Sequence, residues 1–371
     1  MITKTKLLRS TLAVALLATG MFACKKDVLE PKGASVPVRQ DTLITFEGLP
    51  VKHTYDNPAV ILNYKEADYK QLFVKNVNES LSSSKRIMSA EQATYPTLEE
   101  LANIEKQNAA NYPNFANLDS ADIVKIKANF PTLTEKQIAD NIGIIEKYYT
   151  KNLQYDVLMD AIDLSAEKTA NAKSGFSTKT TLSLSDQFSW AEFWYLLWRP
   201  GGFNCVYNAK RKTEEYMNLY GYYGPGSAPA GHLDKWDAYR HCLWSTLMSK
   251  YYAQITGDKV TGYTFAHEFG NLHESEHSPM YGEPEKQMDL HNNQTGRVIF
   301  NNTSRVDVSR RWWWFTQRTL VCSSDDEYRD IAKAKMNVAI QVPFDDKNTA
   351  NYYISVNAIS SSSVEELVKL W

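Results

Sequence analysis

Cysteine is scarce in this sequence, long apolar runs are missing beyond its first residues, and neither sign of charge dominates. The chain has 4 cysteines among 371 residues, and their spacing does not resemble a zinc knuckle. No segment after the N-terminus is apolar for long enough to cross a bilayer. The formal net charge is -2 at pH 7, so the chain lacks the basic surface that nucleic acid requires. We therefore expect neither a membrane-spanning helix nor a nucleic-acid partner.

The N-terminus has the three parts of a secretory signal. A positive segment from Lys4 to Arg9 precedes a short apolar run from Leu12 to Ala18. The run ends in Met21-Phe22-Ala23-Cys24, which resembles a lipobox, although an ordinary cleaved signal with an incidental cysteine is the alternative. Acyl chains contribute about 0.8 kcal/mol per buried CH₂, enough to hold a protein at a membrane without a spanning helix. We expect residues 1–23 to be a lipoprotein signal peptide, and Cys24 to anchor an exported protein at the bacterial cell envelope, where its partner would be a protein or a lipid.

Composition divides the remainder of the chain into a tether, two helical regions and a linker. Residues 24–45 are rich in Lys, Pro, Gly and Ser and predict a lipidated tether. Residues 46–165 carry helical patterns, including a Thr-x-x-Glu capping box at Thr97, but no titratable cluster. Residues 166–188 shift to Ser, Thr, Lys and Ala and predict a linker, followed by a helical C-terminal domain over residues 189–371. The predicted fold class is mainly α.

Histidine is concentrated in the second helical region. All histidines except His53 fall between His232 and His291, and an unperturbed pKa of about 6.5 suits this side chain to acid–base work and metal binding. The stretch from Asp234 to Ile255 has no helix breaker, and Asp237 and His241 share one face of the helix that it predicts. Polar groups on a packing face need partners, because unpaired burial costs about 1–3 kcal/mol. A structural network and an active site share that requirement.

A second helix is predicted from Tyr263 to His277. Its last residues, His273-Glu274-Ser275-Glu276-His277, match the H-E-x-x-H pattern in which two histidines chelate zinc and the glutamate is a general base. Pro279 is expected to end the helix just after this motif, whereas the helices of zinc peptidases continue. A zinc peptidase is therefore the less favoured interpretation.

A third helix is predicted from Glu283 to Phe300. It places Asp289, Asn293 and Arg297 on one face, with Asn292 beside them. Consecutive asparagines are poor residues for a helix interior, because their side chains compete with the backbone for hydrogen bonds. Their presence indicates either that the amides are needed or that this is a loose, solvated helix end.

The three segments together resemble a family of uncharacterised bacterial helical domains that occur in exported proteins and at the ends of toxin-like surface proteins. The resemblance covers roughly residues 225 to 300 and rests on the phrases D-A-x-R-H-x-x-W from Asp237, H-E at His273, and M-D-x-x-N-N-x-x-G-R from Met288. It implies convergence of Asp237, Arg240, His241, His273, Glu274, Asp289, Asn292, Asn293 and Arg297. No activity comes with the resemblance.

The residue types in this set allow two main functions. In the first, a hydrolase uses a divalent metal or a His/Asp pair to activate water against an ester or a phosphodiester. We then expect His241, His273, Glu274 and Asp289 to be catalytic, with His241, His273 and Asp289 as metal ligands. Asp237, Arg240, Asn292, Asn293 and Arg297 would bind or orient. In the second, the protein is a non-catalytic binding or structural lipoprotein with a closed polar network. A third possible function is that of a secreted toxin-type effector, but the tether at Cys24 disfavours it.

Overall fold

The computed structural model describes most of the chain beyond its N-terminal segment. The described residues are 42–53, 57–82, 96–173, 189–220, 233–276, 282–312, 315–344 and 356–370. They belong to one compact unit, Gln40–Trp371, within which all the contacts below are made. The expected signal peptide, the lipidated Cys24 and His277 of the H-E-x-x-H motif lie outside the described residues. Among the described helices, none is long and apolar enough to cross a membrane.

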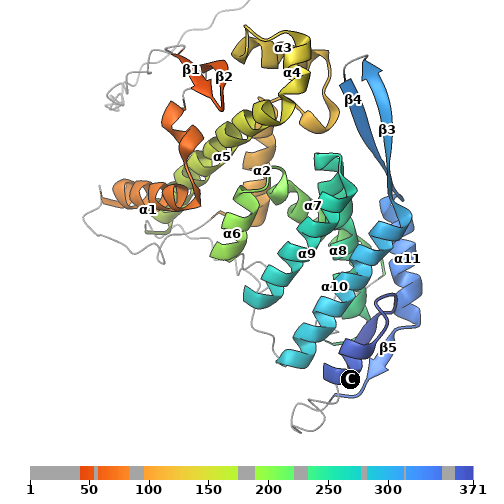
Figure 1. The fold of residues 1–371 in the computed structure, drawn as a ribbon. Coiled ribbons are helices and arrows are strands. Elements are labelled where there is room, and N and C mark those ends of the chain that lie inside the picture. Colours follow the sequence, from red (N-terminus) through yellow and green to blue (C-terminus); the bar gives the residue numbers. More distant parts are fainter. Residues whose placement is uncertain are drawn as a thin grey trace, which may run out of the picture. The chain divides into compact units, whose positions relative to one another are not determined.

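The first half of the described chain is a small hairpin followed by helices (Figure 1). Strands β1 (Thr42–Phe46) and β2 (Leu49–His53) pair antiparallel, with Thr42 opposite His53. The helices that follow are a short 3-10 helix (Ala59–Asn63), α1 (Glu66–Ser82), α2 (Leu98–Ala109), a second 3-10 helix (Phe115–Asn117), α3 (Ser120–Asn129), α4 (Glu135–Asp140) and α5 (Ile142–Lys173). The long helix α5 contacts α1, α2, α4 and α6, so it is the centre of this half.

Local sequence sets where these helices begin and end. The capping box predicted at Thr97 is confirmed: its side chain accepts from the backbone of Glu100, whose carboxylate accepts from Thr97 in return. Helix α5 extends to Lys173 and so occupies the first part of the expected linker over residues 166–188. Strand β1 likewise begins at Thr42, within the expected tether.

The second half is a helical bundle with short strands attached. Its elements are α6 (Trp190–Leu197), α7 (Gly202–Leu219), α8 (Lys235–Thr256), α9 (Lys259–Glu276), α10 (Glu283–Thr303), β3 (Arg305–Trp312), β4 (Phe315–Val321), α11 (Asp325–Asn337), β5 (Ile340–Val342) and β6 (Val368–Leu370). Strands β3 and β4 form an antiparallel hairpin, and β5 pairs with β6 in parallel. Helices dominate both halves, which confirms the predicted mainly α class.

Helices α8, α9 and α10 lie side by side and contact one another closely (Figure 1). Glycines permit this approach: a Cβ on Gly296 of α10 would stand 2.1 Å from the backbone oxygen of Cys242 on α8. A Cβ on Gly262 of α9 would stand 2.3 Å from the oxygen of Ser249, also on α8. Thr246 donates to the Gly296 oxygen at 3.0 Å, which joins α8 and α10 further. Such close helices bring even short polar side chains within reach of each other.

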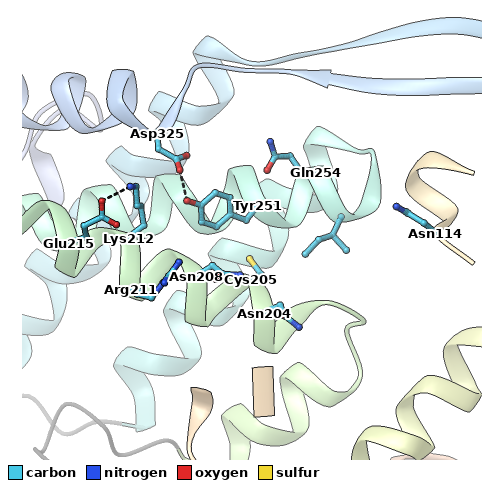
Figure 2. Close-up of a pocket in the computed structure, with 11 residues that line it drawn as sticks. Asn114, Asn204, Cys205, Asn208, Arg211, Lys212, Glu215, Tyr251, Gln254 and Asp325 are labelled. Atoms are coloured by element: carbon cyan, nitrogen blue, oxygen red, sulfur yellow. Dashed lines mark hydrogen bonds and ion pairs between the residues drawn. The ribbon is translucent and has the colours of Figure 1, made fainter. Parts of the chain in front are cut away.

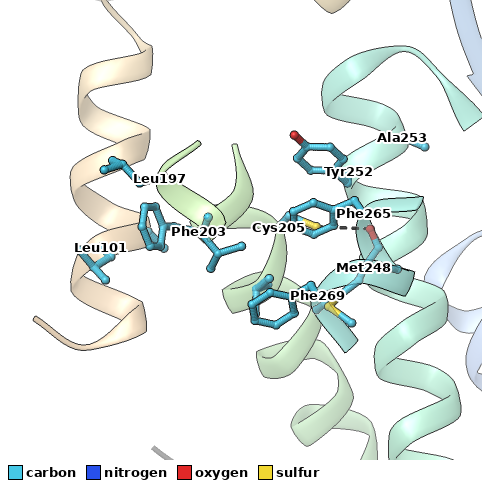
Figure 3. Close-up of a cluster of buried hydrophobic side chains, with 14 of the residues drawn as sticks. Leu101, Leu197, Phe203, Cys205, Met248, Tyr252, Ala253, Phe265 and Phe269 are labelled. Carbon is cyan, nitrogen blue, oxygen red and sulfur yellow. Dashed lines mark hydrogen bonds between the residues drawn. The ribbon is translucent and has the colours of Figure 1, made fainter. Parts of the chain in front are cut away.

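An apolar cluster closes one end of this bundle (Figure 3). Aromatic rings from α7, α8 and α9 meet there, and Tyr252 and Phe265 stack with ring centroids 3.8 Å apart. The thiol of Cys205 donates to the backbone oxygen of Met248 at 3.3 Å and is fully enclosed by the cluster. Burial raises the pKa of this thiol, so Cys205 is a packing residue and not a nucleophile.

Candidate functional site

One histidine and two carboxylates from α8 and α10 meet in the bundle, and we call them the carboxylate–histidine cluster: Asp237, His241 and Asp289. One ligand atom from each lies within 4.8 Å of the other two, and all three side chains are buried. The Nε2 atom of His241 stands 3.2 Å from Oδ1 of Asp289 and 3.6 Å from Oδ1 of Asp237. Two ligands of a tetrahedral ion with bonds of about 2.1 Å stand roughly 3.4 Å apart. The spacing therefore fits a metal ion shared by the three.

The tautomer of His241 follows from its neighbours. An arginine can only donate, so the Nη2 atom of Arg240, 3.1 Å from Nε2, requires Nε2 to be an acceptor. The proton of the neutral ring is then on Nδ1, which lies 3.5 Å from Oε1 of Glu274 on α9. Asn293 in turn donates to the same Glu274 oxygen at 3.2 Å. A histidine whose other nitrogen faces a carboxylate is the usual arrangement of a metal ligand.

Burial sets the charge state of the cluster. Removal from water, reinforced by the guanidinium of Arg240, lowers the pKa of His241 to about 3, so the ring is neutral at physiological pH. Burial also raises the pKa of Asp289 well above its usual range, and the neighbouring carboxylates of Glu274 and Asp237 push it in the same direction. A divalent cation would reverse the second effect, because it would favour the ionised carboxylate.

Some polar atoms of this region have no hydrogen-bond partner. Among the described residues they include Nδ1 of His241, Oδ1 of Asp289, Oδ1 of Asn293, and Nε and Nη1 of Arg297. Each of these atoms is buried, and native interiors seldom leave such atoms unpaired. These atoms therefore keep bonding capacity that the described residues do not use.

Arg240 is more exposed than the members of the carboxylate–histidine cluster that it contacts, with 39% of its side chain accessible. Its Nη2 atom forms an ion pair with Oδ1 of Asp237 and also contacts Nε2 of His241. The guanidinium thus lies against two of the three ligand atoms of the carboxylate–histidine cluster. Its positive charge occupies the neighbourhood that a bound cation would need.

His273, which we expected to be a metal ligand, turns toward a different helix. Its Nδ1 donates to Oε1 of Glu192 on α6 at 2.7 Å, and its ring lies 5.1 Å from the ring of Trp244. Adjacent helical residues point about 100° apart, so His273 and Glu274 cannot both face the same point. The geometry therefore favours Asp237 over His273 as the third ligand.

Sequence reasoning missed Glu192, although a local signal existed. Ser189 and Glu192 form a capping box, in which the Oε2 atom of Glu192 accepts from the Ser189 backbone at 2.7 Å. The other carboxylate oxygen is the one that holds His273. One buried glutamate therefore both starts α6 and orients a histidine at the edge of the site.

Asn292 and His291 form hydrogen bonds with the C-terminal segment and not with the carboxylate–histidine cluster. The Asn292 amide donates to the backbone oxygen of Val368 at 2.9 Å and accepts from the Val368 backbone nitrogen at 2.9 Å. Nε2 of His291 donates to the backbone oxygen of Glu366 at 2.9 Å. These pairs dock β6 against α10, which is a structural contact.

A polar cleft lies elsewhere, along α7 and α8 near Asp325 (Figure 2). Its volume is about 650 Å³, and none of the predicted site residues lines it. Its charged groups pair locally: Lys212 donates to Glu215 at 2.7 Å, and Tyr251 donates to Asp325 at 2.7 Å. The cleft is therefore separate from the carboxylate–histidine cluster.

The fold and the cluster define a mainly helical protein with a buried acid–histidine centre. Within it, residues 193–317 match the family model of a domain of unknown function (DUF6973). The matched span includes every member of the cluster, with Glu274, Asn293 and Arg297. No curated protein matches the chain.

Proposed function

We propose that the carboxylate–histidine cluster binds a divalent metal ion and that the protein is a metal-assisted hydrolase of ester or phosphodiester bonds. The carrying observation is that His241 Nε2 stands 3.2 Å from Asp289 Oδ1 and 3.6 Å from Asp237 Oδ1, and that one ligand atom from each of the three residues lies within 4.8 Å of the others. The acceptor state of Nε2 and the position of Glu274 behind Nδ1 support the same assignment.

The donor set narrows the metal and its chemistry. One imidazole and two carboxylates suit Zn²⁺ or Mn²⁺ better than a thiolate-seeking ion. Three protein ligands leave a coordination position for water, and such an ion makes bound water acidic enough to supply a nucleophile near neutral pH. Glu274 would fix the orientation of His241, and Asn293 would fix Glu274.

His273 and Glu192 would serve as the acid–base pair beside the metal. The ring of His273 is partly exposed, so a substrate can reach it, and Glu192 orients the ring through Nδ1.

Metal titration calorimetry of the purified body tests the proposal. Wild type is expected to bind Zn²⁺ or Mn²⁺ with one-to-one stoichiometry. His241→Ala and Asp289→Asn should abolish that binding and, with it, hydrolysis of a nitrophenyl ester or of bis(nitrophenyl) phosphate. His267→Ala is the matched control, because His267 is an exposed histidine of α9 outside the cluster.

The competing interpretation is a non-catalytic structural lipoprotein, and one observation favours it. Arg240 already supplies a positive charge beside Asp237 and His241, so the cluster is partly neutralised without a metal. Calorimetry without binding, together with unfolding of both cluster variants, would support this function and reject the hydrolase.

We also propose that the chain is an exported lipoprotein with Cys24 as its anchor, as the signal anatomy and the lipobox indicate. An ester or phosphodiester of a lipid would then be within reach. Incorporation of labelled palmitate into wild type but not Cys24→Ser is the expected result. Equal labelling of the two, or none in either, would reject the anchor.

A further inference from the structure

Leu233, the residue before the N-cap of α8, has a backbone conformation that few side chains adopt. Its φ angle is 76°, in the left-handed region. A bulky residue is a rare outlier there, because its Cβ crowds the neighbouring carbonyl, so other contacts must hold Leu233 in this conformation. Residues strained in this way are concentrated at functional sites. The contacts of Leu233 lead to the carboxylate–histidine cluster.

The two backbone polar groups of Leu233 join this cluster to the C-terminal strand. Its N–H donates to Oδ2 of Asp237 at 3.0 Å, and its carbonyl oxygen accepts from the backbone N–H of Leu370, in β6, at 2.8 Å. The other carboxylate oxygen of Asp237, Oδ1, is the one that faces Nε2 of His241. Asp237 is therefore held through one oxygen by the segment that β6 fixes, and its other oxygen is directed at the cluster.

The side chain of Leu233 packs in a small apolar cluster that is separate from the main core. The members of this cluster are Leu233, Met288, Val342, Ile359, Val368 and Leu370. Met288 directly precedes Asp289 on α10, and Asn292 on the same helix bonds to Val368 through both atoms of its amide. Strand β6 thus contacts both of the helices that supply the carboxylate–histidine cluster.

An ordinary helix cap does not account for the bond between Leu233 and Asp237. In a capping box, the third residue of the helix accepts from the N–H of the N-cap residue itself. The N-cap of α8 is Asp234, yet Asp237 accepts from Leu233, one residue earlier. Because φ is the rotation about the N–Cα bond, the left-handed value at Leu233 determines where this earlier N–H points relative to the helix.

We propose that Leu233 is a positioning residue for Asp237, and that docking of β6 is thereby coupled to metal binding at the carboxylate–histidine cluster. The docked strand holds the strained turn, and the turn holds Asp237. A metal ion bound through Asp237 would in return stabilise the docked strand, because coupling between two sites is reciprocal. The part of this proposal that concerns the metal rests on the proposed hydrolase function, whereas the link from β6 to Asp237 does not.

Hydrogen exchange in a chelator-containing buffer tests the link from β6 to Asp237 without any metal. In Asp237→Ala, Leu233 loses the acceptor of its N–H, so the peptide that contains β6 should exchange roughly tenfold faster than in wild type. Asp289→Ala is the matched control, because it truncates the other carboxylate of the cluster, to which Leu233 does not donate. It should leave the exchange of this peptide unchanged. Equal acceleration in both variants, or none in Asp237→Ala, overturns the link.

Leu370→Pro tests the same link from the strand and keeps the experiment decisive if Asp237→Ala fails to fold. Proline has no N–H, so the bond to the Leu233 oxygen is lost, and exchange at the start of α8 should become faster in the same buffer. Lys369→Ala is the matched control, because it changes a side chain of β6 and leaves every backbone N–H in place. Unchanged exchange at the start of α8 in Leu370→Pro contradicts the proposal.

Zinc calorimetry tests the coupling to the metal. Leu370→Pro is expected to bind Zn²⁺ roughly tenfold more weakly than wild type, although Leu370 is not a ligand. Adding Leu233→Gly should restore part of the affinity, because glycine adopts the left-handed conformation without help from β6. A purely structural role of β6 would not give this rescue. Unchanged Zn²⁺ binding in Leu370→Pro overturns the coupling, whereas a wild type that binds no Zn²⁺ rejects the hydrolase and leaves the exchange experiments to decide the link.

Discussion

Two buried histidines show how differently the halves of the molecule treat polar groups. In the first half, Nε2 of His53 donates to the Asn57 oxygen at 2.7 Å, and Nδ1 accepts from the Tyr148 hydroxyl at 2.8 Å. In the bundle, Nε2 of His241 faces two carboxylates and an arginine, and Nδ1 has no hydrogen-bond partner. Both ring nitrogens of His53 are therefore hydrogen-bonded within the folded protein, whereas Nδ1 of His241 is not.

The contrast extends beyond the two rings. Around α5, Tyr149 donates to Asn129 at 2.8 Å, and Asn129 donates to the Lys52 oxygen at 2.8 Å. Among the described residues of that half, Gln154 has the one buried side-chain atom that lacks a hydrogen bond. Polar groups in the first half therefore fix its packing, whereas several in α8, α9 and α10 have bonding capacity that the proposed metal site would use.

The largest effect should come from breaking the close approach of the bundle helices. Gly296→Ala places a Cβ 2.1 Å from the Cys242 oxygen, so we expect a loss of about 3 kcal/mol of stability as α8 and α10 separate. Gly143→Ala in α5 is the matched change, because nothing lies within 4 Å of its added Cβ. It should instead stabilise by about 0.5 kcal/mol. Urea unfolding of both variants measures the difference, and similar losses would contradict it.

The contact between the two halves should respond to pH. Glu105 of α2 accepts from the backbone of Gly201 at 2.8 Å and of Asn204 at 2.9 Å, at the start of α7. Burial outweighs these hydrogen bonds and raises the pKa of Glu105 from 4.5 to about 7. The unfolded chain loses this proton first, so stability should fall as pH rises from about 4.5 to about 7, by about 3 kcal/mol. Unfolding of Glu105→Gln across this range should lack the decline, and an unchanged decline would assign it to another group.

The next comparison is between His241 in the bundle and His53 in the first half. At a metal concentration of 100 times the Kd, wild type should gain about 2.7 kcal/mol of stability. His241→Ala should lose this gain. His53→Ala should keep the gain but unfold about 1–3 kcal/mol more easily, because it removes the buried hydrogen bond between His53 and the Tyr148 hydroxyl. Thermal unfolding with and without Zn²⁺ separates the outcomes, and a metal response lost equally in both variants would remove the distinction.

Sequence reasoning was most successful where the chemistry is local. Helical periodicity predicted α8 and α10 nearly to their ends, and it placed Asp237 with His241 and Asp289 with Asn293 on shared faces. Their contact across the helices depends on Gly296, whose role cannot be read from spacing alone.

What sequence reasoning missed depends on contacts between distant segments. Glu192 is 81 residues from His273, and Val368 is 76 residues from Asn292, so neither pairing leaves a periodic signal. The hairpin of β3 and β4 was also not foreseen. The choice between His273 and Asp237 as third ligand required knowledge of which helix each face meets.

The smallest effect tests whether Arg240 opposes or assists the metal. Its guanidinium touches Asp237 and His241 on the side where a cation would bind, and its partial exposure lets it swing away. Removing the competing charge with Arg240→Gln should tighten Zn²⁺ binding roughly tenfold, about 1.4 kcal/mol, because the ion no longer displaces the guanidinium. If Arg240 instead holds Asp237 in its ligand position, the same variant will bind Zn²⁺ more weakly. Calorimetry of this variant therefore decides whether the ion pair between Arg240 and Asp237 competes with the metal ion or positions Asp237 to bind it.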